Sequence, residues 1–365
     1  MGRRWGRLIA ALALTVTACG QFGTAQEETR AGEAAPLHAE SRVESATPGP
    51  DRPAERPDPS QTLARCLPMT GLDPLPGLDP LPATDATAQI AEITDRVETA
   101  RGLEFTGNEV TPEFVSRDEM SRRIIAQVDT AYSPEEADSD RRIFAALGAV
   151  PPDTDLRALV TGLLTSGVDG FYDSKTGELV VATADPSAPL GPSAQSTLAH
   201  ELTHAITDAR LGIPDGLIEE GPADAALAAL SLVEGDAVLE QQRFELSSIP
   251  PAAQLEAMSD PAFAEAVRQL ISAPHILGAQ FLFPYTWGAA FTCDLFHGGG
   301  NAAVDAAYRD LPTTTAQILF PERCRSGGRR RSPRPWRADG RVAACSHRHL
   351  RRRRAFMAVR GAWRR

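Results

Sequence analysis

The sequence has few lysines, aromatic residues and cysteines for its length. Of 365 residues, 6% are aromatic, five are cysteine, and only Lys175 is lysine. Residues 321–365 hold 16 of the 37 basic and 2 of the 48 acidic residues, so residues 1–320 carry a formal charge of about −25. Nucleic-acid binding needs a basic surface that displaces counterions. The composition therefore excludes a nucleic-acid partner for the main part of the chain.

Long hydrophobic runs are also lacking, apart from a short one near the N-terminus. Residues 8–16 are apolar, follow three arginines, and are too few to span a bilayer. Residues 16–19, Val-Thr-Ala-Cys, resemble the lipobox of bacterial lipoproteins, in which the cysteine is lipidated after cleavage. We expect residues 1–18 to be a lipoprotein signal peptide and Cys19 to anchor an exported protein to the outer face of the bacterial cytoplasmic membrane. An ordinary signal peptide is the alternative.

Two segments have no apolar periodicity. Residues 19–83 are rich in Ala, Glu, Pro and Thr and contain Gly-Leu-Asp-Pro-Leu-Pro twice in succession, which is typical of a disordered tether. Residues 323–365 are arginine-rich. One interpretation is a basic tail that contacts anionic lipid, and the other, which we favour, is a shifted reading frame. Apart from Cys19, the only cysteines before the arginine-rich residues are Cys66 and Cys293. They form either a disulfide or two free thiols.

Residues 84–322 have the pattern of one α+β domain. Short apolar runs on both sides of Ser-Lys-Thr-Gly predict a β-hairpin over residues 168–183, and one or two short strands are expected within 104–115. Pro192 and Gly212 mark the start and the end of a helix. A mostly helical second half follows. Further helices are expected at residues 84–101, 118–131, 156–164, 222–244, 261–271, 285–296 and 302–308.

The helix that begins near Pro192 carries His-Glu-Leu-Thr-His at residues 200–204, an H-E-x-x-H motif. His200 and His204 are one turn apart, so their imidazoles can bind the same metal ion. Glu201 lies beside them, where it can hold the water that a metal activates. The motif therefore predicts a Zn²⁺ site in a hydrolase, with Glu201 as the catalytic base.

A catalytic zinc site usually has a third protein ligand. We favour Glu234, because its helical neighbours are apolar and an unpartnered carboxylate there would be costly to bury. Glu219 and Glu220 are competitors, although favourable charges at a helix N-terminus also explain them. Asp236 is either an acceptor for the N–H of a ligand histidine or a surface carboxylate.

Four motifs carry a resemblance to a known family: Leu-Ala-His-Glu-Leu-Thr-His-Ala at 198–205, Leu-Val-Glu-Gly-Asp-Ala at 232–237, Gly-Phe-Tyr-Asp at 170–173 and Pro-Tyr-Thr-Trp-Gly at 284–288. Over residues 100–322 the chain resembles largely uncharacterised bacterial lipoproteins with a gluzincin-like metallopeptidase domain. The resemblance implies a zincin-like fold, with a small sheet packed on the H-E-x-x-H helix. It also implies that His200, His204 and Glu234 are zinc ligands and that Glu201 is the base. Phe320 and Cys324 depart from it, because His and Tyr are expected there.

The same resemblance suggests how a substrate would be held. Gluzincins add a Tyr or His that hydrogen-bonds the oxyanion, and Tyr285 and His297 are the candidates. The strand at residues 178–183 would be the edge that pairs with an extended substrate. We therefore expect a zinc-dependent peptidase that cleaves an unidentified peptide or protein outside the cytoplasmic membrane. The alternatives are a binding or scaffold lipoprotein with a zincin fold, and a zinc site that only stabilises the fold.

Overall fold

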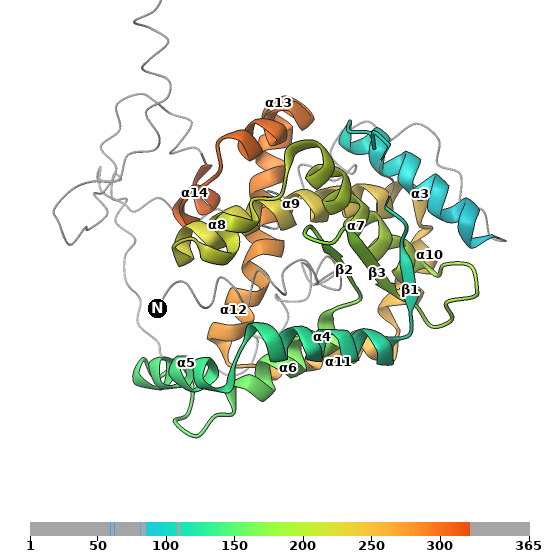
Figure 1. Cartoon of the computed structure of the whole chain (residues 1–365). Coiled ribbons are helices and arrows are strands. Elements are labelled where there is room, and N and C mark those ends of the chain that lie inside the picture. The colour runs from blue at the N-terminus through green and yellow to red at the C-terminus, as the bar shows by residue number, and fades with distance from the viewer. Residues whose placement is uncertain (1–58, 60–61, 63–80, 82–84, 108–109, 322–365) are drawn as a thin grey trace, which may run out of the picture. The chain divides into compact units, whose positions relative to one another are not determined.

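The computed structural model describes residues 59, 62, 81, 85–107 and 110–321 (Figure 1). The predicted signal peptide, the Cys19 anchor, the arginine-rich tail and nearly all of the tether lie outside these residues. Leu81, which the sequence places in the tether, is buried in the same apolar cluster as Ile93. The packed domain therefore begins before residue 84. Within the described part of the chain, no helix has the length and apolar content needed to cross a membrane.

The first helices begin and end at local sequence signals. Helix α3 (Ala86–Arg101) is capped by the Asp85 side chain and ends at Gly102, whose φ of 66° is left-handed. Helices α4 (Arg117–Ala131) and α6 (Leu156–Gly167) match their predicted ranges closely. Helix α5 (Pro134–Ala146), which the sequence analysis missed, starts with a Ser133–Glu136 capping box.

A three-stranded sheet is made of β1 (Glu113–Val115), β2 (Gly170–Asp173) and β3 (Glu178–Ala182). The predicted hairpin is confirmed, because β2 and β3 pair antiparallel. Strand β3 also pairs with β1 in parallel, so the order is β1-β3-β2. The expectation that residues 178–183 form an edge strand is therefore wrong, since β3 has a neighbour on both sides.

Alternate residues of β3 belong to different apolar clusters. Leu179 and Val181 pack with residues of α7 (Pro192–Leu211), including Leu198 and Leu202. Val180 packs instead with residues of α4 and α6. This alternation follows from the two-residue repeat of a strand. The sheet therefore lies between the H-E-x-x-H helix on one face and α4 with α6 on the other, as Figure 1 shows.

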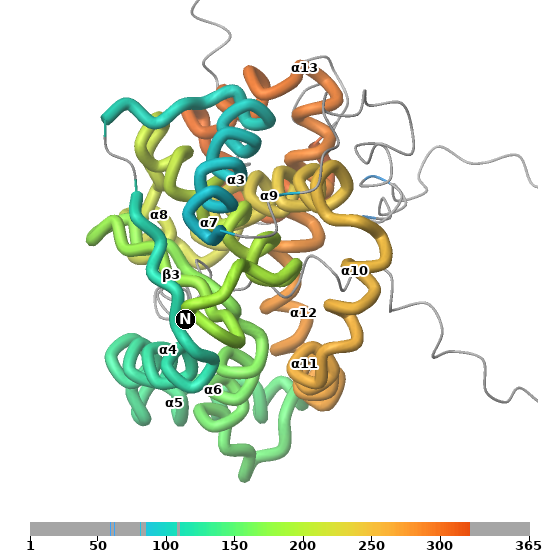
Figure 2. Tube along the Cα trace, turned by 90° about the vertical axis from the view of Figure 1, so that its right-hand side faces the viewer, coloured from blue at the N-terminus to red at the C-terminus, as the bar shows by residue number. Residues whose placement is uncertain are grey.

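The second half of the described chain is helical and is built around α9 (Ala223–Ser248). Most of α9 is buried on all sides, between α7, α13 (Ala289–Arg309) and a π-helical segment, η3 (Pro284–Gly288). In Figure 2, α10 (Pro251–Met258) and α11 (Pro261–Ser272) follow α9, and α11 packs against α6. Helices α8 (Asp215–Glu220), α12 (His275–Phe283) and α14 (Thr315–Leu319) complete the domain. The coarse prediction of an α+β domain with a small sheet and a helical second half is confirmed.

Two differences from the predicted helices have local causes. Residues 285–296 and 302–308 lie in the single helix α13 and the preceding η3, and a kink at Gly299 and Gly300 separates the two predicted pieces. The four-residue turn between β2 and β3 contacts α8, because Lys175 pairs with Glu219 and the Ser174 hydroxyl donates to Asp215. Glu219 and Glu220 are the last two residues of α8 and lie in sequence just before α9, which begins at Ala223.

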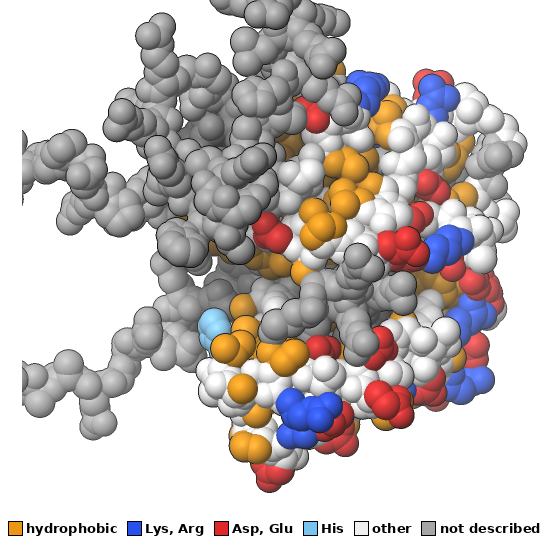
Figure 3. Space-filling view, turned by 60° about the vertical axis from the view of Figure 1, so that its left-hand side comes forward, with side chains coloured by type: hydrophobic (Ala, Val, Ile, Leu, Met, Phe, Trp, Pro, Cys, Tyr) orange, Lys and Arg blue, Asp and Glu red, His pale blue; other side chains and the backbone are white. Residues whose placement is uncertain are grey.

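Acidic and basic side chains are interspersed on the surface shown in Figure 3. Many of the ion pairs are local, such as Arg122 with Glu119 and Arg141 with Asp138. On the described part of this face, the blue side chains do not form a continuous basic patch.

Candidate metal centre

Two buried helices bring the predicted metal ligands together. His200 and His204 project from α7, and Glu234 projects from α9, which packs against it. The two Nε2 atoms are 3.1 Å apart, and Oε2 of Glu234 lies 3.4 Å from Nε2 of His200 and 3.5 Å from Nε2 of His204. We call these three residues the metal-ligand cluster. Their side chains are at most 1% exposed. The three donor atoms therefore face a common point that is shielded from solvent.

The Glu234 carboxylate is buried beside the two histidines. Among the described residues, neither carboxylate oxygen of Glu234 accepts a hydrogen bond of normal geometry. Burial raises the pKa of Glu234 to about 7, with His200 and Tyr285 opposing the shift. Burial also lowers the pKa of His204 to about 4, against the charges of Asp236 and Asp208, and lowers the pKa of His200. A neutral histidine pair beside an unsatisfied buried carboxylate suits a cation that all three can share.

No protein-family model, curated protein or solved structure matches this chain. The assignment of the metal-ligand cluster therefore rests on its geometry. What the structure shows is a buried His-His-Glu group that can hold a metal ion.

The tautomer of His200 is fixed by Gln241. Nδ1 of His200 lies 3.0 Å from Oε1 of Gln241, which can only accept a hydrogen bond, so the proton is on Nδ1. The amide is oriented in turn by Ser196 and Glu245, because Nε2 of Gln241 donates to Oγ of Ser196 at 2.8 Å and to Oε1 of Glu245 at 3.3 Å. Nε2 of His200 is left with its lone pair pointing at the cluster, which is the form that binds a metal.

These supporting hydrogen bonds were not predicted, although the spacing of the residues in the sequence contained a signal for them. Gln241 follows Glu234 by seven residues, so both lie on the same side of α9 two turns apart. Glu245 is one turn beyond Gln241, and Ser196 is one turn before His200 on α7. Polar residues at these intervals on two buried helices predict a shared network.

Asp236 does not have the role expected for it. In the described chain it accepts hydrogen bonds from Arg101, Tyr308 and, at 3.5 Å, Thr207, and none from His200 or His204. It is 1% exposed and is therefore not a surface carboxylate either. Burial lowers the pKa of His204, and the negative charge of Asp236 opposes this effect. Asp236 mainly joins α9 to α3 and α13 through these contacts.

Glu201 lies between the metal-ligand cluster and the sheet. It is fully buried on α7, and its Cγ would be 3.2 Å from a Cβ atom at Gly170, the first residue of β2. A Cβ there would also be 2.5 Å from Cγ2 of Thr197, which is closer than real side chains allow. Only glycine therefore lets β2 approach α7 at this point. This close approach packs β2 against the Glu201 side chain.

Tyr285 is placed near the cluster by η3. The Tyr285 side chain is 3% exposed and favours the ionised form of Glu234. Two glycines allow this approach: a Cβ at Gly235 would lie 2.2 Å from the backbone of Gly288, and a Cβ at Gly288 would lie 2.1 Å from the carbonyl oxygen of Ser231. π-Helical turns are often found at functional sites. The other predicted oxyanion donor, His297, is exposed on α13, outside the buried cluster.

The remaining candidates lie away from the cluster. Glu219 pairs with Lys175 on the surface, and Glu220 is at the end of α8. Cys293 is disulfide-bonded and buried on α13. The pairing with Cys66 that the sequence left open falls outside the described residues, as does the predicted lipidation of Cys19.

Proposed function

We propose that this protein is a zinc-dependent hydrolase with a zincin-like domain, and that its substrates are peptides or proteins. The convergence of His200, His204 and Glu234 carries the proposal. Glu201 beside them supplies the base that such a reaction needs. The lipobox-like segment at Cys19 supports export and attachment to the outer face of the cytoplasmic membrane as part of the same proposal.

The spacing of the donor atoms supports zinc. Tetrahedral zinc bound at about 2.0–2.1 Å separates its nitrogen and oxygen ligands by roughly 3.3 Å. The three separations in the cluster are 3.1, 3.4 and 3.5 Å. Two imidazoles and one carboxylate are also a common catalytic zinc set, whereas calcium and magnesium prefer oxygen ligands alone. One tetrahedral position remains for water or substrate.

Each residue of the proposed site would have its own role in hydrolysis. A bound zinc ion would acidify water and polarise the scissile carbonyl. Glu201 would take the proton from the attacking water and deliver it to the leaving amine. The hydroxyl of Tyr285 would donate a hydrogen bond to the carbonyl oxygen as that oxygen gains charge. Gln241 would keep His200 in the tautomer that leaves Nε2 free to bind.

The burial of the cluster favours a second candidate, a metal site that only stabilises the fold. His200, His204, Glu201 and Glu234 are each at most 1% exposed, and catalysis requires an open path to one ligand position. A structural site usually has four protein ligands, whereas three converge here among the described residues. For this reason we prefer catalysis.

The substitution Glu201→Gln distinguishes the two candidates. If Glu201 is the base, hydrolysis of a peptide library should fall by about 10²- to 10⁴-fold while the protein keeps one zinc per chain. Library digestion would be followed by mass spectrometry, and zinc by atomic absorption. Glu135→Gln, on the exposed surface of α5, is the matched control and should change neither quantity. Wild-type protein that holds zinc but cleaves nothing would support the stabilising site instead.

A further inference from the structure

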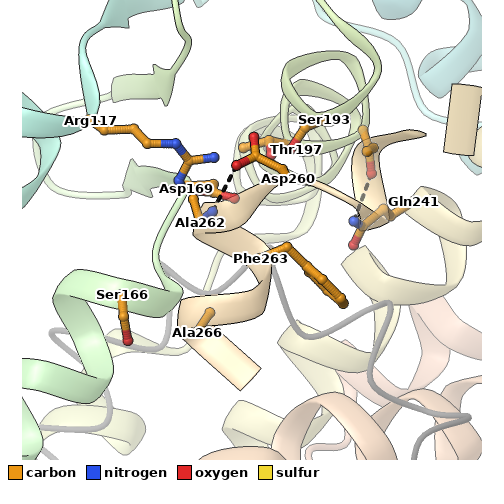
Figure 4. Close-up of a pocket in the computed structure, with 12 residues that line it drawn as sticks. Arg117, Ser166, Asp169, Ser193, Thr197, Gln241, Asp260, Ala262, Phe263 and Ala266 are labelled. Atoms are coloured by element: carbon orange, nitrogen blue, oxygen red, sulfur yellow. Dashed lines mark hydrogen bonds and ion pairs between the residues drawn. The ribbon is translucent and has the colours of Figure 1, made fainter. Parts of the chain in front are cut away.

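A hollow of about 450 Å³, counted with the solvent-filled space at its mouth, lies beside the buried centre (Figure 4). Its walls come from the segment between α6 and β2, the first turns of α7, the middle of α9, and α10 with α11. Neither the metal ligands nor Glu201 line it. The proposed catalytic mechanism therefore leaves its function open.

Three lining residues lie next to the reacting groups, and one of them, Gln241, contacts a proposed metal ligand. Thr197 lines it and lies one helical turn before His200 and Glu201 on α7. Gln241 also lines it and holds Nδ1 of His200 at 3.0 Å. Asp169 lines it too, and the next residue, Gly170, packs so closely against α7 that an added Cβ would meet Thr197 and Glu201. The pocket is therefore one side chain away from the metal-ligand cluster.

The polar wall of the pocket has an excess of negative charge. Arg117 and Asp169 form an ion pair at 2.5 Å. Asp260 uses Oδ1 to cap α11 through the backbone N–H of Ala262 at 2.8 Å. Figure 4 shows the Asp260 carboxylate and the Arg117 guanidinium directed into the same space above Asp169. Burial raises the pKa of Asp169, and the charge of Asp260 raises it further. Two carboxylates and one guanidinium line this wall, and Arg117 pairs with Asp169.

The opposite wall is apolar and suits an extended hydrocarbon chain. Phe263 and Ala266 of α11 line this side, together with Ala257 and Ala262. The hydroxyl groups of Ser193 and Thr197 lie along the α7 side. Lysine and arginine combine an apolar stem with a cationic end, and proteins bind them by covering the stem and pairing the charge. The pocket offers both surfaces.

We propose that this pocket binds the side chain of a lysine or arginine next to the scissile bond of a peptide substrate. The inference rests on the proposed function, because it gives that function a substrate class. The Asp260 carboxylate would pair with the substrate cation, and Phe263 would cover its hydrocarbon stem. The Arg117 guanidinium would neutralise Asp169 and weaken the attraction for the incoming charge.

Library profiling with matched variants tests the pocket. The zinc-loaded full chain would digest a peptide library randomised around the cut, and we expect lysine and arginine to be enriched at one position adjoining it. Asp260→Asn keeps a side chain that caps α11 but removes the charge, so the enrichment should fall about tenfold. Asp85→Asn makes the same change at the cap of α3, away from the pocket, and should leave the enrichment unchanged.

A binding experiment separates failure of the pocket from failure of the proposed function. The same library would be passed over immobilised, zinc-loaded Glu201→Gln protein, and the retained peptides sequenced. Retention of lysine- and arginine-containing peptides without cleavage by wild type would overturn hydrolysis and support the pocket. Cleavage that depends on Glu201 but shows no basic preference would overturn the pocket alone. Enrichment of acidic residues or C-terminal carboxylates, lost in Arg117→Gln, would also overturn it, because Arg117 would then be the binding group.

Discussion

At the scale of single residues, the orientation of His200 depends on an amide that the sequence motif does not include. Gln241 accepts a hydrogen bond from Nδ1 of His200. Ser196 and Glu245 accept hydrogen bonds from the Gln241 amide and so fix its orientation. Supporting hydrogen bonds of this kind typically change metal affinity by about 10- to 100-fold. The strength of the proposed zinc site therefore depends on residues that never touch the ion.

Gln241→Leu should weaken zinc binding by about 10- to 100-fold, because the Nδ1 proton of His200 loses its buried acceptor. Competition with a chromogenic chelator measures this affinity. Gln242→Leu is the matched control, since Gln242 is the next residue on α9 and does not contact His200. Equal losses in the two variants would mean that the effect comes from packing of α9 and not from the hydrogen bond.

Zinc binding at about pH 6 should release close to one proton, and the proton should come from Glu234. Its pKa is raised to about 7 by burial, so the acid is mostly protonated there and must ionise to bind a cation. The pKa of His204 is lowered to about 4, so this histidine is already neutral, and burial lowers the pKa of His200 as well. Zinc affinity should thus fall as pH drops below about 7. Calorimetry in buffers of different ionisation enthalpy counts the proton, and Glu234→Gln should release none.

Some of the site could be predicted from residue types, and some could not. His200, Glu201 and His204 belong to one local motif. Glu234 could be predicted as a ligand because its helical neighbours are apolar. For Asp236 the prediction failed because its partner, Arg101, is 135 residues away in the sequence and no local pattern indicates that contact. The position of Tyr285 depends on close backbone contact between two elements. Sequence spacing alone does not contain that information.

At the scale of elements, glycines determine how closely the helices around the cluster approach one another. Gly235 on α9 and Gly288 in η3 face each other at distances that exclude any side chain. The predicted helices α3, α6, α7 and α11 agree with the structure because their caps and apolar spacing are local. The pairing of β1 with β3 was missed because three helices lie between these strands in the chain.

Gly235→Ala should destabilise the protein by about 1–3 kcal/mol and lower any hydrolysis, because the added methyl group would push η3, and Tyr285 with it, away from Glu234. Urea unfolding and peptide cleavage measure the two effects. Gly216→Ala in α8 is the control, since a Cβ there meets nothing within 4 Å. That change should be neutral or stabilise by up to about 1 kcal/mol. A Gly235→Ala protein as stable and active as wild type would contradict the close contact.

At the scale of the whole domain, one buried arginine connects elements that are distant in the chain. Arg101, at the end of α3, is fully buried and pairs with Asp236 of α9 at 3.1 Å and with Asp305 of α13 at 2.8 Å. Tyr308 donates to the same Asp236 carboxylate. Glu234 is two residues before Asp236, so this network also fixes the part of α9 that carries the proposed third ligand.

Arg101→Met should cost about 3–5 kcal/mol in the free energy of unfolding, because the buried carboxylate of Asp236 and the partly buried one of Asp305 lose their counter-charge. The midpoint of urea unfolding reports the loss. Arg122→Met removes an arginine of α4 that is 73% exposed and, within the described part of the chain, pairs only with Glu119 of the same helix, so stability should change by less than about 0.5 kcal/mol. Similar losses in both variants would show that the buried network contributes little.

The turn between β2 and β3 carries the chain's only lysine, Lys175, whose side chain is 59% exposed although it pairs with Glu219. Amine-directed dyes would therefore modify a single side chain of this protein. That position joins the strand next to Glu201 to α8, so a fluorophore on Lys175 would report on movements of the sheet against the helices when zinc or a peptide is added. Few proteins of this length allow such labelling without first removing native lysines.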